Sequence, residues 1–136
     1  SSDWQVGEMD PLVGIYSALT RAGLDGTSSW TPDGIITLDQ ALFGYTHEGA
    51  WAWHAEDRLG VIRPGADADL VAWSADLYQL DPSALLEQRA DLTIVGGQIV
   101  HDTGATGGDQ GEQGLNRIDI AAKTLNPDRS CSGHGH

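Results

Sequence analysis

Residues 58–73, RLGVIRPGADADLVAW, decide the fold because they join two parts of the chain that have different patterns. Residues 59–62 predict a short strand and residues 70–73 a buried strand, since both runs are apolar. Between them, Pro64 and Gly65 predict a tight turn, because proline fixes φ at the first turn position and glycine supplies the positive φ that the next requires. Helical patterns precede this stretch and sheet patterns follow it.

A first helix is predicted on the N-terminal side, from Pro11 to about Ala22. Asp10 can accept hydrogen bonds from the free amides at its start, and proline loses nothing at the first helical position. Gly23 is expected to end the helix in the left-handed conformation. Residues 24–34 are rich in Gly, Ser, Thr, Asp and Pro, and they predict a loop.

A second helix is predicted from Thr37, because Thr37 and Gln40 have the spacing of a capping box. One face of this helix would carry Leu38, Ala41, Leu42 and Tyr45. Gly49 is expected to break this helix, and residues 50–55 to form another short helical piece.

The C-terminal half predicts a sheet. Residues 82–89 should form a short helix over it, since an Asp-Pro pair again precedes the run. Two runs of strand type, residues 92–95 and 98–101, flank Gly96-Gly97, and this pattern is typical of a β-hairpin. Just before the strand at residue 70, Asp69 is expected to accept hydrogen bonds from exposed amides.

Length and charge restrict the class of protein. The chain has 136 residues and a formal net charge of −13, with 20 acidic residues against seven Lys plus Arg. It is one domain or a piece of one, and it is too short for a complete (β/α)8 barrel of roughly 250 residues. The negative charge makes nucleic acid and anionic membranes poor partners. No apolar run is long enough to span a membrane, so we expect a soluble protein.

Two further observations bear on the origin of the chain. It begins Ser1-Ser2-Asp3, without an initiator methionine or an apolar leader, which suggests a portion of a longer protein. Its single cysteine, Cys131, excludes an internal disulfide and is consistent with a reducing, cytoplasmic location.

Few residues have the pattern of a catalytic site. Asp3 precedes the first helix and could lie at the end of a strand, where barrel enzymes collect catalytic groups, but a loop aspartate has the same pattern. His47 and Glu48 are adjacent and point apart on a helix, so they do not form a zinc pair. His54 could share a face with His47, but no third ligand accompanies them. Surface or packing histidines are the preferred interpretation.

The tail contains a second possible ligand group. Cys131, His134 and His136 lie within six residues and are all possible metal ligands. Because glycines separate them, chelation would cost conformational entropy, and adventitious binding or disorder is the preferred interpretation. Residues 103–114, TGATGGDQGEQG, predict a mobile linker before this tail.

Five pieces of the chain together resemble the C-terminal part of metal-dependent amidohydrolases, most closely the branch that includes the N-substituted formamide deformylases. In chain order they are SDWQV, PLVGIYSALTR, ITLDQALFGYTHEGAWA, DRLGVIRPGADADLVAW and LTIVGGQIVHD. They span residues 2–102. The G-x-x-x-x-G-x-x-A-D-L pattern from Gly60 to Leu70 is the most specific of them.

The resemblance implies an α/β fragment: the last strand and helices of a (β/α)8 barrel over residues 1–57, and part of a small β-sandwich over residues 58–102. Residues 103–136 would be a linker and tail. The SDW piece matches the end of the eighth barrel strand, where the family has an aspartate that binds the metal and transfers protons. By this match, Asp3 is the catalytic and metal-binding residue.

The resemblance further implies hydrolysis of a small-molecule, amide-type carbon–nitrogen bond, in which hydroxide bound to a divalent metal of the zinc type attacks the carbonyl. Two departures from the family accompany it. Gln5 stands where the family usually has proline, and the H-x-H pair and other metal ligands are absent from the sequence. This chain alone is therefore expected to be inactive. The alternative is a non-catalytic structural or oligomerisation module, in which unpaired sheet edges join copies of the chain.

Overall fold

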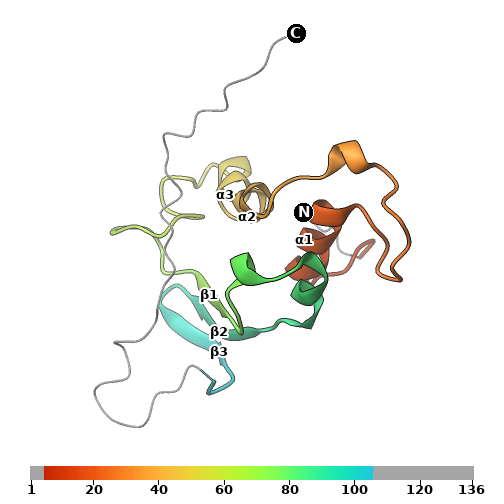
Figure 1. Cartoon of the computed structure of the whole chain (residues 1–136). Coiled ribbons are helices and arrows are strands. Elements are labelled where there is room, and N and C mark those ends of the chain that lie inside the picture. Colours follow the sequence, from red (N-terminus) through yellow and green to blue (C-terminus); the bar gives the residue numbers. More distant parts are fainter. Residues whose placement is uncertain (1–4, 106–136) are drawn as a thin grey trace.

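The computed structural model describes residues 5–105 (Figure 1). The helices are α1 (Pro11–Thr20), α2 (Leu38–Tyr45) and α3 (His47–Ala52), with 3-10 segments at Pro32–Gly34, Leu77–Gln79 and Pro82–Glu87. The strands are β1 (Leu70–Trp73), β2 (Ala90–Val95) and β3 (Gln98–Asp102). The predictions for Asp3, for the linker beyond residue 105 and for the tail concern residues that lie outside this range. No helix in residues 5–105 is long and apolar enough to cross a membrane.

Helix α1 begins as predicted but ends earlier. The Asp10 carboxylate accepts a hydrogen bond from the amide of Leu12 at 2.9 Å. The left-handed residue at the other end is Arg21, with φ 53°, so the prediction that Gly23 ends the helix was wrong. The following loop explains the difference: the amide of Trp30 donates to the Arg21 carbonyl at 3.1 Å, and the Arg21 guanidinium donates to Thr31 Oγ1 at 3.2 Å.

The capping box of α2 is confirmed, whereas the predicted break at Gly49 was wrong. The Gln40 amide donates to Thr37 Oγ1 at 3.2 Å, and the Thr37 amide donates to Gln40 Oε1 at 2.9 Å. The helix breaks at Thr46, where ψ is −84°, and α3 continues through Gly49. The Thr46 hydroxyl donates to the carbonyl of Leu42 at 2.8 Å, which compensates for the break.

Helix α3 ends in a Schellman motif with a histidine at the left-handed position. His54 has φ 56°, its amide donates to the Trp51 carbonyl, and the amide of Ala55 donates to the Ala50 carbonyl, both at 2.9 Å. A side chain in this conformation costs roughly 1 kcal/mol, and glycine avoids the cost.

The His54→Gly variant is therefore expected to raise the free energy of unfolding by about 1 kcal/mol. Urea unfolding of the chain measures the change. Glu48→Gly, an exposed position within α3, is the control, and it should lower the free energy of unfolding by about 1 kcal/mol. If both glycines destabilised the chain equally, the left-handed strain at His54 would be disproved.

Residues 58–73 form a loop and one strand rather than two strands. The predicted turn is confirmed, because the amide of Ala66 donates to the Arg63 carbonyl at 3.1 Å and Gly65 has φ 87°. The strand predicted over residues 59–62 is absent. The loop is closed by Arg58 and Asp67 instead. The Arg58 side chain forms an ion pair with the Asp67 carboxylate, and the Asp67 amide donates a hydrogen bond to the Arg58 carbonyl. The strand over residues 70–73 is confirmed as β1, although it is partly exposed rather than buried.

The three strands form one antiparallel sheet in the order β1-β2-β3. The predicted hairpin is confirmed, with φ 56° at Gly96 and 79° at Gly97. Asp69 accepts the Gly96 amide at 2.7 Å, and the Gly97 amide donates to the Ala68 carbonyl at 3.0 Å. The expected role of Asp69 is thus confirmed, and its carboxylate fixes the hairpin turn to the start of β1. Within residues 5–105 there is this single sheet of three strands, where four sandwich strands were predicted.

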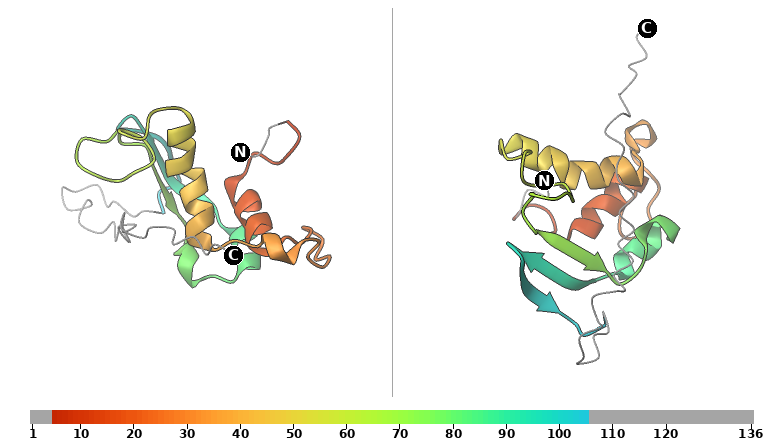
Figure 2. Two further views of the ribbon diagram at one scale, coloured as in Figure 1. Left: turned by 90° about the horizontal axis from the view of Figure 1, so that it is seen from above. Right: turned by 90° about the vertical axis from the view of Figure 1, so that its left-hand side faces the viewer.

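The hydrophobic core lies between the helices and the 3-10 segments. Its buried residues come from α1, α2 and the two segments after β1, and they are Leu12, Ile15, Ala41, Leu77 and Leu85. The helix predicted over residues 82–89 is the 3-10 segment Pro82–Glu87, which packs against α1. Helices α2 and α3 lie nearly end to end (Figure 2). They lie on the side of α1 that is opposite to the 3-10 segment Pro82–Glu87. Many large apolar side chains outside the core remain exposed.

Candidate functional site

The part of the chain that the structure describes does not contain a metal centre. Asp3, Cys131, His134 and His136 lie outside it. Within residues 5–105, no group of three or more His, Cys, Asp or Glu side chains is arranged to hold a metal ion. A hydrolytic zinc ion needs about three protein ligands besides water. These residues therefore do not fit a divalent metal by themselves.

The structure separates the two histidines of the helical part, although their spacing would allow a shared face. The ring of His47 lies 4.8 Å from that of Phe43, measured between centroids. Its Nδ1 atom is buried and has no hydrogen-bond partner among the described residues. His47 and Glu48 line an open hollow together with Phe43, Trp51 and Ala52. His54 is not part of this lining, so the structure does not bring the two histidines into one site.

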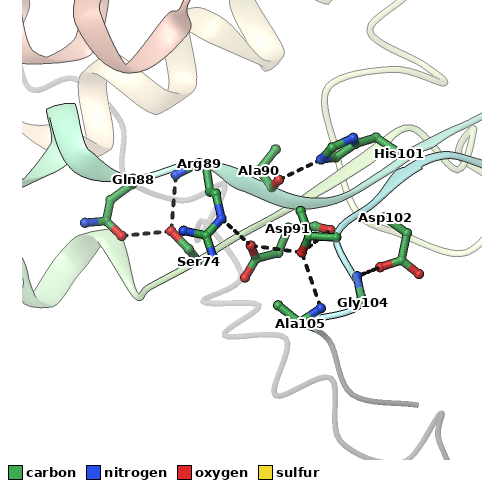
Figure 3. A network of polar contacts seen from close by, with 10 residues as sticks. Ser74, Gln88, Arg89, Ala90, Asp91, His101, Asp102, Gly104 and Ala105 are labelled. Carbon is green, nitrogen blue, oxygen red and sulfur yellow. Dashed lines mark hydrogen bonds and ion pairs between the residues drawn. The ribbon is translucent and has the colours of Figure 1, made fainter. Parts of the chain in front are cut away.

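A polar cluster that sequence reasoning missed lies at the end of the sheet where β2 begins and β3 ends (Figure 3). Asp91 is buried, and its Oδ1 pairs with Arg89 Nε at 3.3 Å and accepts a hydrogen bond from the Thr103 hydroxyl at 3.2 Å. The amide of Thr103 donates to the Asp91 carbonyl at 2.9 Å. His101 Nε2 lies 3.0 Å from the carbonyl of Ala90.

The same cluster extends to β1. The Ser74 hydroxyl donates to Gln88 Oε1 at 2.9 Å and accepts from the Arg89 amide at 3.1 Å. The Gln88 side-chain amide donates to the carbonyl of Ala84 at 2.9 Å. These hydrogen bonds join the strand ends to one another and to the 3-10 segment Pro82–Glu87, which makes the cluster structural. A charged residue in a mostly apolar strand, Asp91 in ADLTIV, was the sequence signal for it.

A second polar contact connects α2 to the segment after β1. Tyr78 donates its hydroxyl to Asp39 Oδ1 at 2.8 Å. Partial burial, this hydrogen bond and the charges of Asp39 and Asp76 raise the pKa of Tyr78 to about 12. The two partners are 39 positions apart in the chain, so no local sequence pattern predicts this contact.

This contact predicts a loss of stability at alkaline pH. Because the folded chain raises the pKa of Tyr78, the protonated form stabilises the fold. The contribution is complete below the unfolded pKa of about 10 and is lost as pH rises toward about 12.

Urea unfolding across this range should show the loss in the parent chain and in a Tyr45→Phe control. Tyr78→Phe should cost about 1 kcal/mol near neutral pH and reduce the alkaline loss. An unchanged alkaline loss in Tyr78→Phe would contradict the assignment.

Comparison with known proteins identifies the family of this chain. The amidohydrolase family matches residues 1–101. The putative amidohydrolase YtcJ of Bacillus subtilis is 31% identical over 103 residues, which are 74% of this chain and 20% of that protein. Protein LONG AFTER FAR-RED 3 of Arabidopsis thaliana is 33% identical over 103 residues, 74% of this chain and 17% of that protein.

A third relative matches a shorter part of the chain. Imidazolonepropionase of Xanthomonas euvesicatoria is 42% identical over 41 residues, 30% of this chain and 10% of the relative. The comparison with solved structures gave no match. The chain thus spans a fifth or less of the length of these relatives.

These matches first define a class, the hydrolases that act on carbon–nitrogen bonds. The chain belongs to the amidohydrolase family. Membership suggests a fold related to the (β/α)8 barrel. The described residues themselves form three α-helices and a small antiparallel sheet.

Proposed function

We propose that this chain is the C-terminal part of a metal-dependent amidohydrolase that cleaves a small-molecule, amide-type carbon–nitrogen bond. The family match over residues 1–101 is the observation that carries this proposal. The five sequence pieces favour the branch that includes the N-substituted formamide deformylases. Residues 1–57 would end the barrel and residues 58–102 would belong to the β-sandwich. We further propose a cytoplasmic location, with neither nucleic acid nor membrane as a partner.

Asp3 is the residue of this chain that would act in the reaction. Its carboxylate would bind the divalent metal, take a proton from the attacking water and pass it to the leaving amine. When bound, a metal of the zinc type polarises the carbonyl and activates water at neutral pH. Because residues 5–105 supply no metal centre, the other ligands would come from the remainder of the polypeptide. The 136-residue chain alone would therefore be inactive.

Metal removal tests the proposal. We expect the intact polypeptide to release amine from an N-substituted formamide or related amide, to lose this activity after treatment with a chelator, and to regain it when zinc is added. The same metal should confer no activity on the 136-residue chain. Hydrolysis that persists in the metal-free intact polypeptide would overturn the proposal.

The open edges of the sheet favour a second candidate, a non-catalytic oligomerisation module. Every residue of β3 is exposed, and within the described residues β3 pairs on one side alone, with β2. Such an edge can pair with a second copy of the chain. An intact polypeptide without amidase activity, together with a chain that dimerises in sedimentation experiments, would favour this candidate.

A further inference from the structure

The loop between α1 and α2 contains the dipeptide Asp-Gly twice, as Asp25-Gly26 and Asp33-Gly34. All four residues are exposed. In such a pair the amide nitrogen of the glycine can attack the side-chain carboxyl group of the aspartate, because glycine has no side chain that shields its amide. The two pairs have the same chemistry, so their surroundings decide which of them reacts.

The carboxylate of Asp25 is held in place. Its Oδ1 accepts a hydrogen bond from the amide of Thr27 at 3.0 Å. Hydrogen bonds from the backbone and side chain of Thr27 lower the pKa of Asp25 below its usual value. Ring closure needs a protonated carboxyl group that is free to turn toward the nitrogen of Gly26. Thr27 opposes both requirements.

The carboxylate of Asp33 has no hydrogen bond or ion pair with any of the residues that the structure describes. Asp33 lies in the single 3-10 turn Pro32–Gly34, in which the glycine amide donates to the Thr31 carbonyl at 2.9 Å. The amide of Gly26 is engaged in the same way, since it donates to the Gly23 carbonyl at 3.1 Å. An exposed turn of this length opens at low cost. The carboxylates, and not the amides, therefore distinguish the two pairs.

We propose that Asp33-Gly34 is a site of spontaneous isomerisation to isoaspartate, and that Asp25-Gly26 is protected from the same reaction in the folded chain. The nitrogen of Gly34 forms a bond to Cγ of Asp33, and the hydroxyl of the carboxyl group leaves with the amide proton as water. The resulting succinimide takes up one water at either carbonyl, which returns aspartate or gives β-linked isoaspartate. No oxidant, reductant or other reagent is needed.

Isomerisation would alter the loop that holds the end of α1. The β-linkage places one additional carbon atom in the backbone of the 3-10 turn, whose hydrogen bond joins Gly34 to Thr31. Shortly after this turn, the amide of Ile36 donates to the carbonyl of Ala18 in α1 at 3.1 Å. A lengthened backbone displaces this contact, so the isomerised chain should unfold at a lower urea concentration than the fresh chain.

Peptide mapping of the 136-residue chain tests the proposal. The folded chain is incubated near neutral pH, and mass spectrometry with electron-transfer fragmentation distinguishes isoaspartate from aspartate in each peptide. We expect isoaspartate to form at least about fivefold faster at position 33 than at position 25, the factor that corresponds to one hydrogen bond of typical net strength. In urea the two rates should become similar, because unfolding removes the hydrogen bonds from Thr27.

Two variants serve as controls. Asp33→Glu keeps the charge but would have to close a larger ring, so the signal at position 33 should disappear. Thr27→Pro removes the amide that binds Asp25 and should raise the rate at position 25. Equal rates at the two positions in the folded chain, or an unchanged rate at position 25 in Thr27→Pro, would overturn the proposal. The measurement uses no substrate or metal, so its outcome is independent of the proposed hydrolase activity.

Discussion

The Gly60→Ala variant is expected to lose about 3 kcal/mol or more of its free energy of unfolding. Gly60 has φ 73°, and an added Cβ would lie 2.6 Å from the carbonyl oxygen of Thr46 and 2.9 Å from the Cα of His47. These are backbone atoms at the junction of α2 and α3, and they cannot yield as a flexible side chain can. The loss therefore combines left-handed strain with a steric clash.

Gly65→Ala is the control that separates these two contributions. Gly65 has φ 87°, but an added Cβ there would meet nothing within 4 Å. Its substitution should cost only the left-handed strain, about 1 to 2 kcal/mol. Urea unfolding of both variants of the 136-residue chain gives the comparison. Equal losses would show that the close approach of the Gly60 loop to Thr46 does not stabilise the fold.

The Asp3→Asn variant of the intact polypeptide is expected to lower kcat by about 10²- to 10⁴-fold. Asparagine keeps the size of the side chain but cannot take a proton from water at neutral pH. Thermal unfolding should be little changed, which would separate a catalytic role from a structural one. Steady-state measurement of amine release provides kcat.

Asp10→Asn makes the same chemical change seven residues further along the chain. Asp10 caps α1, and asparagine caps helices equally well, so this variant should retain both turnover and stability. If Asp3→Asn turned over substrate as fast as Asp10→Asn, the role proposed for Asp3 would be refuted.

Local signals explain which elements could be predicted. The capping box of Thr37, the Asp-Pro start of α1 and the Gly96-Gly97 hairpin each depend on atoms a few residues apart, and all three are confirmed. Their hydrogen bonds form within the segment itself. Sequence patterns therefore carry enough information to place them.

The predictions that were wrong concern elements whose ends depend on contacts between residues distant in sequence. The loop that returns to Arg21 places the left-handed residue there instead of at Gly23. The break between α2 and α3 lies at Thr46, where Gly60 packs against the backbone, and not at the predicted Gly49, which lies within α3. Residues 59–62 have no neighbouring strand among the described residues, so they remain a loop. None of these partners can be read from the local sequence.

The candidate site was predictable only in part. Asp3 is identified through the resemblance of the SDW piece, because its own local pattern is that of an ordinary loop aspartate. The Tyr78 contact with Asp39 and the Asp91 cluster join residues that are distant in sequence or hidden within a strand. Their physical effect becomes visible only when the sheet and helices are assembled.

Anomalous diffraction at the zinc edge, from crystals of the intact polypeptide soaked with zinc, tests the central claim most directly. We predict a metal peak about 2.0 to 2.2 Å from a carboxylate oxygen of Asp3, with the remaining protein ligands coming from outside this chain. A fully liganded catalytic metal with Asp3 distant from it would contradict the account.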